Sequence, residues 1–243
     1  MSFFTPLSVL AGLIPNLAPP DLKIKTVNQQ EVDRFSANPK NPYLVSFPRT
    51  GSHWIRMLSE LVFEQPTLVR PFHYRDNNNY LYLHHHDIDL SLKRTNVVYL
   101  YREPVATVYS DLKYHRSDPD SLENIRQKTT FYACHAEKWL CQESFTTRKT
   151  VLNYEAFQKD VIHEFTKLAN HLELPFDADR LVVVAEQITK NKVKEMTNHY
   201  DDKVVNQAAD YDEQRELFKH RYGDYIWDLM LKGRPHLRDF FSR

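Results

Sequence analysis

The sequence predicts an α/β fold with a central parallel sheet covered by helices. Three short apolar runs, rich in β-branched and aromatic residues, lie at 43–47, 97–101 and 150–154. Each run is followed by apolar residues at helical spacing. Repeated strand-then-helix units are typical of parallel sheets, because each helix carries the chain back across the sheet. A fourth candidate strand lies at 80–84, and a long helix is expected at 121–143.

Composition excludes several classes of protein. Lys plus Arg and Asp plus Glu number 32 each, so no overall positive field favours nucleic acid as a partner. The apolar N-terminus lacks a basic start and is interrupted by prolines, which indicates a docking arm rather than a signal peptide. No run approaches the roughly 18 apolar residues of a membrane span. Cys134 and Cys141 are predicted to be reduced thiols on one helix face, so we expect a cytoplasmic protein. The sequence predicts no oligomeric state.

The loop after the first predicted strand has the composition of an anion-binding turn. Its sequence is VSFPRTGSHW, residues 45–54, and it holds Gly51, one of four glycines in the chain. A helix N-terminus offers unpaired N–H groups and the positive end of the helix dipole. Thr50 and Ser52 add hydroxyls, and Arg49 adds a positive charge. No lysine follows Gly51, which disfavours a magnesium triphosphate. An ordinary capped strand-to-helix turn is the alternative.

A second basic turn follows the run at 97–101. Arg102 stands at the predicted carboxyl end of that strand, where ligands of open parallel sheets bind. Pro104 suits the first position of a helix, and Ser110 lies two turns into it. Arginine is suited to bidentate binding of phosphate. Pairing of Arg102 with Glu103 or another carboxylate is the alternative.

Together, the two turns resemble the nucleotide-binding motifs of the sulfotransferases that use 3′-phosphoadenosine 5′-phosphosulfate (PAPS). Pro-Arg-Thr-Gly-Ser-His-Trp at 48–54 is similar to the family's 5′-phosphosulfate loop, usually Pro-Lys-Ser-Gly-Thr-x-Trp. Arg102 and Ser110 have the spacing of its 3′-phosphate motif, and the two motifs come in the family's order. The resemblance implies a P-loop-NTPase-like fold, PAPS as co-substrate, 3′-phosphoadenosine 5′-phosphate (PAP) as product, and no metal.

The same resemblance implies a set of donor-binding residues. The 5′-phosphosulfate contacts the loop, the 3′-phosphate contacts the second basic turn, and adenine stacks on an aromatic ring, which offers a platform for a base. Fainter matches late in the chain extend the set toward adenine and the 3′-phosphate. The predicted residues are Arg49, Thr50, Gly51, Ser52, His53, Trp54, Arg102, Ser110, Tyr154, Thr189, Lys219 and Arg221.

The sequence departs from the family pattern at two places. Arg49 stands where lysine is usual, and arginine stabilises charge on a leaving oxygen without readily releasing a proton. A role as proton donor is therefore in doubt. The family's C-terminal Arg-Lys-Gly is replaced by Lys-His-Arg at 219–221, before Gly223. A solvated basic turn is the alternative there.

The histidine run at 84–86 supplies candidate bases for taking a proton from the acceptor hydroxyl. Histidine has an intrinsic pKa of about 6.5, which suits general base catalysis. Strand alternation points His84 and His86 to one face and His85 to the other. The family often carries Lys-x-His here, which places His86 at the base and His84 at the lysine. The predicted catalytic residues are therefore His86, Arg49 and His84. Metal contact, exposure or packing are the alternatives for the triplet.

We expect one sulfotransferase domain over residues 1–243. It comprises an N-terminal arm (1–40), a PAPS-binding core (41–175) and a helical C-terminal part that closes the site (176–243). The acceptor is predicted to be a hydroxyl of a small molecule or glycan. The segment at 70–82, rich in Asn, Tyr and Arg, favours a sugar or a polar glycolipid head. A P-loop-type small-molecule kinase and a non-catalytic nucleotide-binding protein remain the competing classes.

Overall fold

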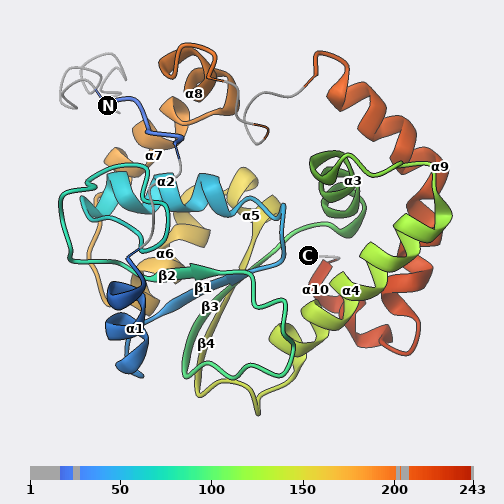
Figure 1. The fold of residues 1–243 in the computed structure, drawn as a ribbon, viewed down its shortest axis with the longest axis horizontal. Helices are drawn as coiled ribbons and strands as arrows, with labels where there is room; N and C mark the ends of the chain where they lie inside the picture. Colours follow the sequence, from blue (N-terminus) through green and yellow to red (C-terminus); the bar gives the residue numbers. More distant parts are fainter. Residues whose placement is uncertain (1–16, 24–27, 201–202, 204–207, 242–243) are drawn as a thin grey trace, which may run out of the picture.

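A four-stranded parallel sheet forms the centre of the computed structural model, which describes residues 17–23, 28–200, 203 and 208–241 (Figure 1). The strands are β1 (Tyr43–Ser46), β2 (Leu83–His85), β3 (Asn96–Tyr101) and β4 (Arg148–Asn153). Their order is β2-β1-β3-β4, and each neighbouring pair is parallel. The predicted α/β fold with a central parallel sheet is confirmed.

Helices cover both faces of this sheet. They are α1 (Gln29–Ala37), α2 (Ser52–Phe63), α3 (Pro104–His115), α4 (Leu122–Cys141), α5 (Tyr154–Lys159), α6 (Val161–Leu172), α7 (Ala178–Gln187), α8 (Lys190–Met196), α9 (Tyr211–Leu231) and α10 (Arg238–Phe241), with a 3-10 turn at Pro235–Leu237. In Figure 1, α3, α4 and α9 lie together on one side, and α2, α6 and α7 on the other. No helix within the described ranges is long and apolar enough to cross a membrane.

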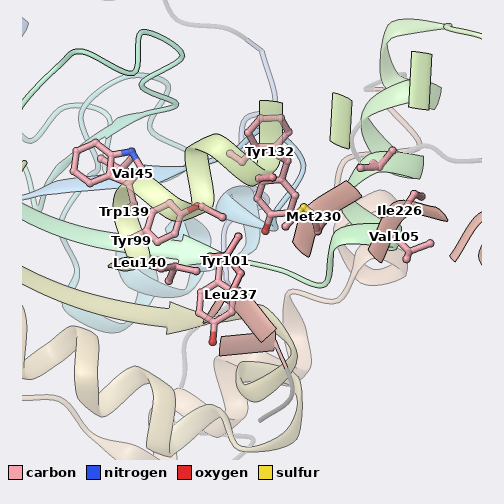
Figure 2. Packing of buried hydrophobic residues seen from close by; sticks show 14 of the residues in the cluster. Val45, Tyr99, Tyr101, Val105, Tyr132, Trp139, Leu140, Ile226, Met230 and Leu237 are labelled. Carbon is pink, nitrogen blue, oxygen red and sulfur yellow. The ribbon is translucent and has the colours of Figure 1, made fainter. Parts of the chain in front are cut away.

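Alternation along the strands divides the core into two clusters, one on each face. Val45 and Tyr99 point toward α3, α4 and α9, where Tyr99 stacks on Trp139 at a centroid distance of 6.4 Å (Figure 2). Leu44 and Val98 point to the opposite face, toward α2, α6 and α7. Both faces bury apolar side chains, so the strands read as continuous apolar runs, as expected for a parallel sheet.

The strand predicted at 80–84 is displaced along the chain. β2 begins at Leu83, whereas the residues before it bond with the 66–68 segment: Leu81 N–H donates to the Pro66 carbonyl and Leu68 N–H to the Tyr82 carbonyl, both at 2.9 Å. These extended residues thus pair outside the sheet. The predicted alternation nevertheless holds, since His84 is buried and His85 is exposed.

The helix starts follow local sequence signals. Pro104 begins α3, and the Glu103 carboxylate caps it by accepting from the N–H groups of Val105 and Ala106. The helix predicted at 121–143 is confirmed as α4, capped by Ser121. The basic run at 219–221 lies inside α9, so the alternative of a basic turn at this place is excluded. Half of the predicted N-terminal arm (1–40) falls in 1–16 and 24–27, outside the described residues.

Candidate active site

A cavity of about 860 Å³ lies beyond the carboxyl ends of the strands, lined by the loops after β1, β2 and β3 and by residues of α5, α8 and α9. It collects most of the predicted site. The predicted residues that line it are Arg49, Gly51, Ser52, His53, Trp54, His86, Arg102, Ser110, Tyr154, Thr189 and Lys219. Thr50, His84 and Arg221 are not among its lining residues.

The loop after β1 is shaped by a close contact between Gly51 and Tyr154. Gly51 is the N-cap of α2 and has a φ of 97°, a conformation that glycine adopts without strain. A Cβ at this position would lie 2.3 Å from two ring carbons of Tyr154. Because glycine offers no side-chain cap, the first N–H groups of α2 are left for another acceptor. Thr50 is buried, and its hydroxyl donates to the Phe47 carbonyl at 2.8 Å. It therefore supports the turn from behind.

Arg49 is held at the cavity wall by two contacts. Its Nε donates to the Ser110 hydroxyl at 3.2 Å, and its guanidinium lies 4.7 Å from the centre of the Tyr114 ring. Burial lowers the pKa of Arg49 from its usual value, but arginine remains charged at neutral pH. The two basic turns thus meet in space, since Arg49 follows β1 and Ser110 belongs to α3.

Arg102 lies between the loop and α5. Its Nη1 donates to the Arg49 carbonyl at 3.2 Å, and its guanidinium lies 4.6 Å from the centre of the Tyr154 ring. Its Nε is 3.8 Å from a Glu155 carboxylate oxygen, which is an ion-pair distance but not a hydrogen bond. The carboxylate partner is therefore Glu155 and not the neighbouring Glu103, which caps α3 instead.

Arg102 Nε and His53 Nε2 are buried nitrogens on cavity-lining residues, and neither has a hydrogen-bond partner within the described residues. A buried polar atom left unpaired costs about 1–3 kcal/mol. Burial first, and then the positive charges of Arg56, Arg70 and Arg49, hold the pKa of His53 well below its usual value, so His53 is neutral. Arg102 and the uncapped start of α2 line the cavity and offer N–H donors to acceptor oxygens, so the residues present fit a phosphate-bearing group.

His86 is set in the tautomer that a general base requires. Its Nδ1 lies 2.8 Å from the Ser46 carbonyl oxygen. Because a carbonyl only accepts, Nδ1 carries the proton and Nε2 keeps its lone pair. Burial lowers the pKa of His86 below 6.5, so the ring is neutral at physiological pH. His86 lines the cavity, as predicted for the catalytic base.

The other two histidines of the triplet have different surroundings. His84 is buried beneath the cavity, with Nε2 3.2 Å from the Ser46 hydroxyl and its ring edge-on to that of His86. His85 is half exposed, and its Nδ1 lies 2.6 Å from Asp87. Asp87 thus orients His85, away from the cavity. This arrangement makes His84 a supporting group and leaves His86 as the only ring of the three that lines the cavity.

Helix α9 separates the two predicted C-terminal ligands. Lys219 and Arg215 both line the cavity. They lie four residues apart and therefore share one face of α9. Arg221 lies on another face, where it pairs with Asp120 at 2.6 Å, and its side chain is 60% exposed. The structure therefore does not bring Arg221 to the cavity.

Sequence reasoning did not find several charged and aromatic lining residues. They are Tyr114, Lys190 and Arg215. No motif marks them, and their place depends on how α3, α8 and α9 pack. The spacing of Arg215 and Lys219 was the one available signal, since it puts both on one face of a helix.

The sequence matches the sulfotransferase domain family over residues 75–242, and the chain belongs to that family. The prediction of a sulfotransferase is confirmed, and with it the class of enzyme. The loop at 48–54 lies ahead of the matched segment. No match was found among curated proteins.

Two solved structures share the fold. The mouse sulfotransferase SULT7A1 complexed with PAP is 15% identical, with a TM-score of 0.55 over 89% of this chain and 95% of that chain. Retinol dehydratase in complex with androsterone and the inactive cofactor PAP is 12% identical, with a TM-score of 0.51 over 84% of this chain and 86% of that chain. At these identities the similarity establishes the fold alone.

Proposed function

We propose that the protein transfers a sulfuryl group from PAPS to an acceptor hydroxyl. The observation that carries the proposal is the convergence of His86, with its tautomer fixed, on a cavity that Arg49, Arg102 and Ser110 also line. When bound, PAPS supplies a sulfuryl group attached to a good leaving group. Family membership and the PAP named in both similar structures support this donor.

The donor's phosphates are assigned to the two basic turns. The N–H groups at the start of α2, with Ser52 and His53, bind the 5′-phosphosulfate end. Arg102 binds the 3′-phosphate, since its guanidinium lines the cavity beside the Tyr154 ring, a position that suits an anion. Trp54 lies edge-on to Tyr154 at 5.8 Å, and these aromatic groups form the wall for adenine.

The chemistry is divided between His86 and Arg49. Nε2 of His86 accepts the proton of the acceptor hydroxyl as the new bond to sulfur forms. Arg49 stabilises the negative charge that develops on the leaving oxygen. Its hydrogen bond to Ser110 and its contact with Tyr114 fix the guanidinium before the reaction, so little reorganisation is needed. Arginine does not release a proton at neutral pH, and the leaving group departs as an anion.

The acceptor is proposed to be a polar hydroxyl compound, such as a sugar or a polar glycolipid head. Arg70, from the predicted acceptor segment, lines the cavity, as do His115 and Tyr114. Charged and aromatic groups of this kind suit a polar ring with several hydroxyls.

A transfer assay with radiolabelled PAPS and a panel of hydroxyl acceptors tests the proposal. His86→Ala is expected to lower kcat by about 10²–10⁴-fold while leaving PAP affinity unchanged. His85→Ala is the matched control, because this histidine is exposed and outside the cavity. Equal loss in both variants would remove His86 as the base. Transfer from ATP with magnesium, and none from PAPS, would favour the kinase alternative.

A further inference from the structure

Positive charges from four separate elements surround one part of the cavity. Lys190 begins α8, Arg215 lies on α9, Arg102 follows β3, and Arg49 follows β1. Like charges gathered in a partly desolvated space repel one another, so such a cluster is stable only with an anion or with nearby carboxylates.

Carboxylates on α9 balance only part of this charge. Arg215 lies 3.1 Å from Asp212 and 3.6 Å from Glu216. Lys190 faces Asp212 and the ring of Tyr211 on α9, but it also faces the positive charges of Arg102, Arg49 and Arg215.

The pKa of Lys190 reflects this balance. Its side chain reaches water within the cavity, but the surrounding protein still reduces its hydration. This burial, followed by the positive charge of Arg102, lowers the pKa of Lys190 to about 8. Arg102, Arg49 and Arg215 thus lie close enough to disfavour the ammonium of Lys190, and Asp212 opposes this effect.

We propose that Lys190, supported by Arg215, binds the 3′-phosphate of the donor opposite Arg102. The proposal rests on the function proposed above. It gives Lys190 the part that sequence resemblance assigned to Arg221, which lies outside the cavity and pairs with Asp120. Helix α8 then contributes a charged ligand to the donor site, beside the adenine-side residue Thr189.

The proposal has a pH consequence with a definite sign. A bound dianion favours the charged ammonium, so PAP binding raises the pKa of Lys190 and takes up a proton above pH 8. The affinity for PAP falls as the pH rises through about 8. A phosphate monoester has already lost its second proton in this range, since that pKa is about 6, so the ligand does not titrate there.

Calorimetry with PAP and with AMP, which lacks the 3′-phosphate, tests the assignment in the full chain. Lys190→Met is expected to weaken PAP binding by about 10-fold or more and AMP binding by less than about twofold. Lys192→Met is the matched control: it lies on the same helix, exposed and outside the cavity, and should change neither affinity. Lys190→Arg should keep PAP affinity constant between pH 7 and 9, since arginine stays charged there.

Each outcome separates the inference from the function on which it rests. If wild-type protein binds PAP no more tightly than AMP, the donor assignment itself fails. If wild type prefers PAP and Lys190→Met keeps that preference, Lys190 is not a 3′-phosphate ligand although the function stands. Equal weakening of PAP and AMP would place Lys190 at the 5′ end and overturn the proposal. Loss in Arg221→Met instead would restore the sequence-based assignment.

Discussion

Replacing Gly51 with alanine isolates the contact that shapes the phosphate loop. The substitution adds one carbon, but it does so at a φ of 97° and 2.3 Å from the ring of Tyr154. Two other glycines separate these effects. Gly233 has a φ of 73° with nothing near its would-be Cβ, and Gly223 lies inside α9 with its nearest contact at 3.9 Å.

The magnitudes follow from these three environments. A left-handed conformation costs a residue with a Cβ about 1–2 kcal/mol, and overpacking a tight contact costs about 1–3 kcal/mol. Gly51→Ala should therefore lower the free energy of unfolding by about 2–5 kcal/mol. Gly233→Ala should lower it by about 1 kcal/mol, and Gly223→Ala should raise it by about 0.5–1 kcal/mol.

Thermal and urea denaturation of the three variants, with calorimetry of PAP binding, checks this order. For a chain of this size, each kcal/mol shifts Tm by about 2–4 °C, so Gly51→Ala should lower it by about 4–20 °C. PAP binding should also weaken in this variant alone, because the Tyr154 ring must move away from Arg102. If Gly51→Ala were as stable as Gly233→Ala and bound PAP with unchanged affinity, the contact with Tyr154 would not determine the conformation of the loop after β1.

Three further predictions concern charge. Arg49→Met should lower kcat by about 10²–10³-fold and Arg49→Lys by less than about 10-fold, since lysine keeps the positive charge. A lysine variant that is faster than wild type in single-turnover assays would indicate that the wild-type enzyme lacks a proton donor at this position. The pH profile of kcat/KM should fall on the acid side with a midpoint below 6.5, because burial lowers the pKa of His86 and its neutral form is the base; a midpoint above 7 would contradict this. Glu60→Ala should lower the free energy of unfolding by about 3–5 kcal/mol in urea denaturation, since the buried carboxylate accepts from the N–H groups of Thr67, Phe72 and His73. Glu123→Ala, on the surface of α4, is the control and should change this free energy by less than about 1 kcal/mol.

The parts of the site that follow strands were predictable from the sequence. Gly51, Arg102 and His86 each come just after an apolar run, and a parallel sheet brings the carboxyl ends of its strands to one edge. The same alternation that buries Leu44 and Val45 on opposite faces separates His85 from His86. Periodicity and topology were therefore sufficient to place both basic turns and the pair His84 and His86, whereas the choice of His86 as the base came from the family resemblance.

The parts of the site that depend on helix packing were not predictable. Arg221 belongs to the basic run that resembles the family motif, but the continuous turn of α9 directs it toward Asp120. Lys190 belongs to no motif, and only the approach of α8 to Arg102 gives it a role. The strand start at Leu83 was missed because the residues before it bond with the 66–68 segment, a tertiary pairing that local sequence does not encode.

Arginine at position 49 connects the two basic turns. Its Nε donates to the Ser110 hydroxyl, which uses one lone pair of that oxygen and leaves its O–H free to donate. In the proposed function, Ser110 would hold Arg49 and a phosphate oxygen at once and so join the proposed 5′ and 3′ sites. A lysine lacks the planar fork needed to bond Ser110 and lie across Tyr114 together. The departure from the family's usual lysine thus fits this cavity, where Ser110 and Tyr114 position the guanidinium before a ligand arrives.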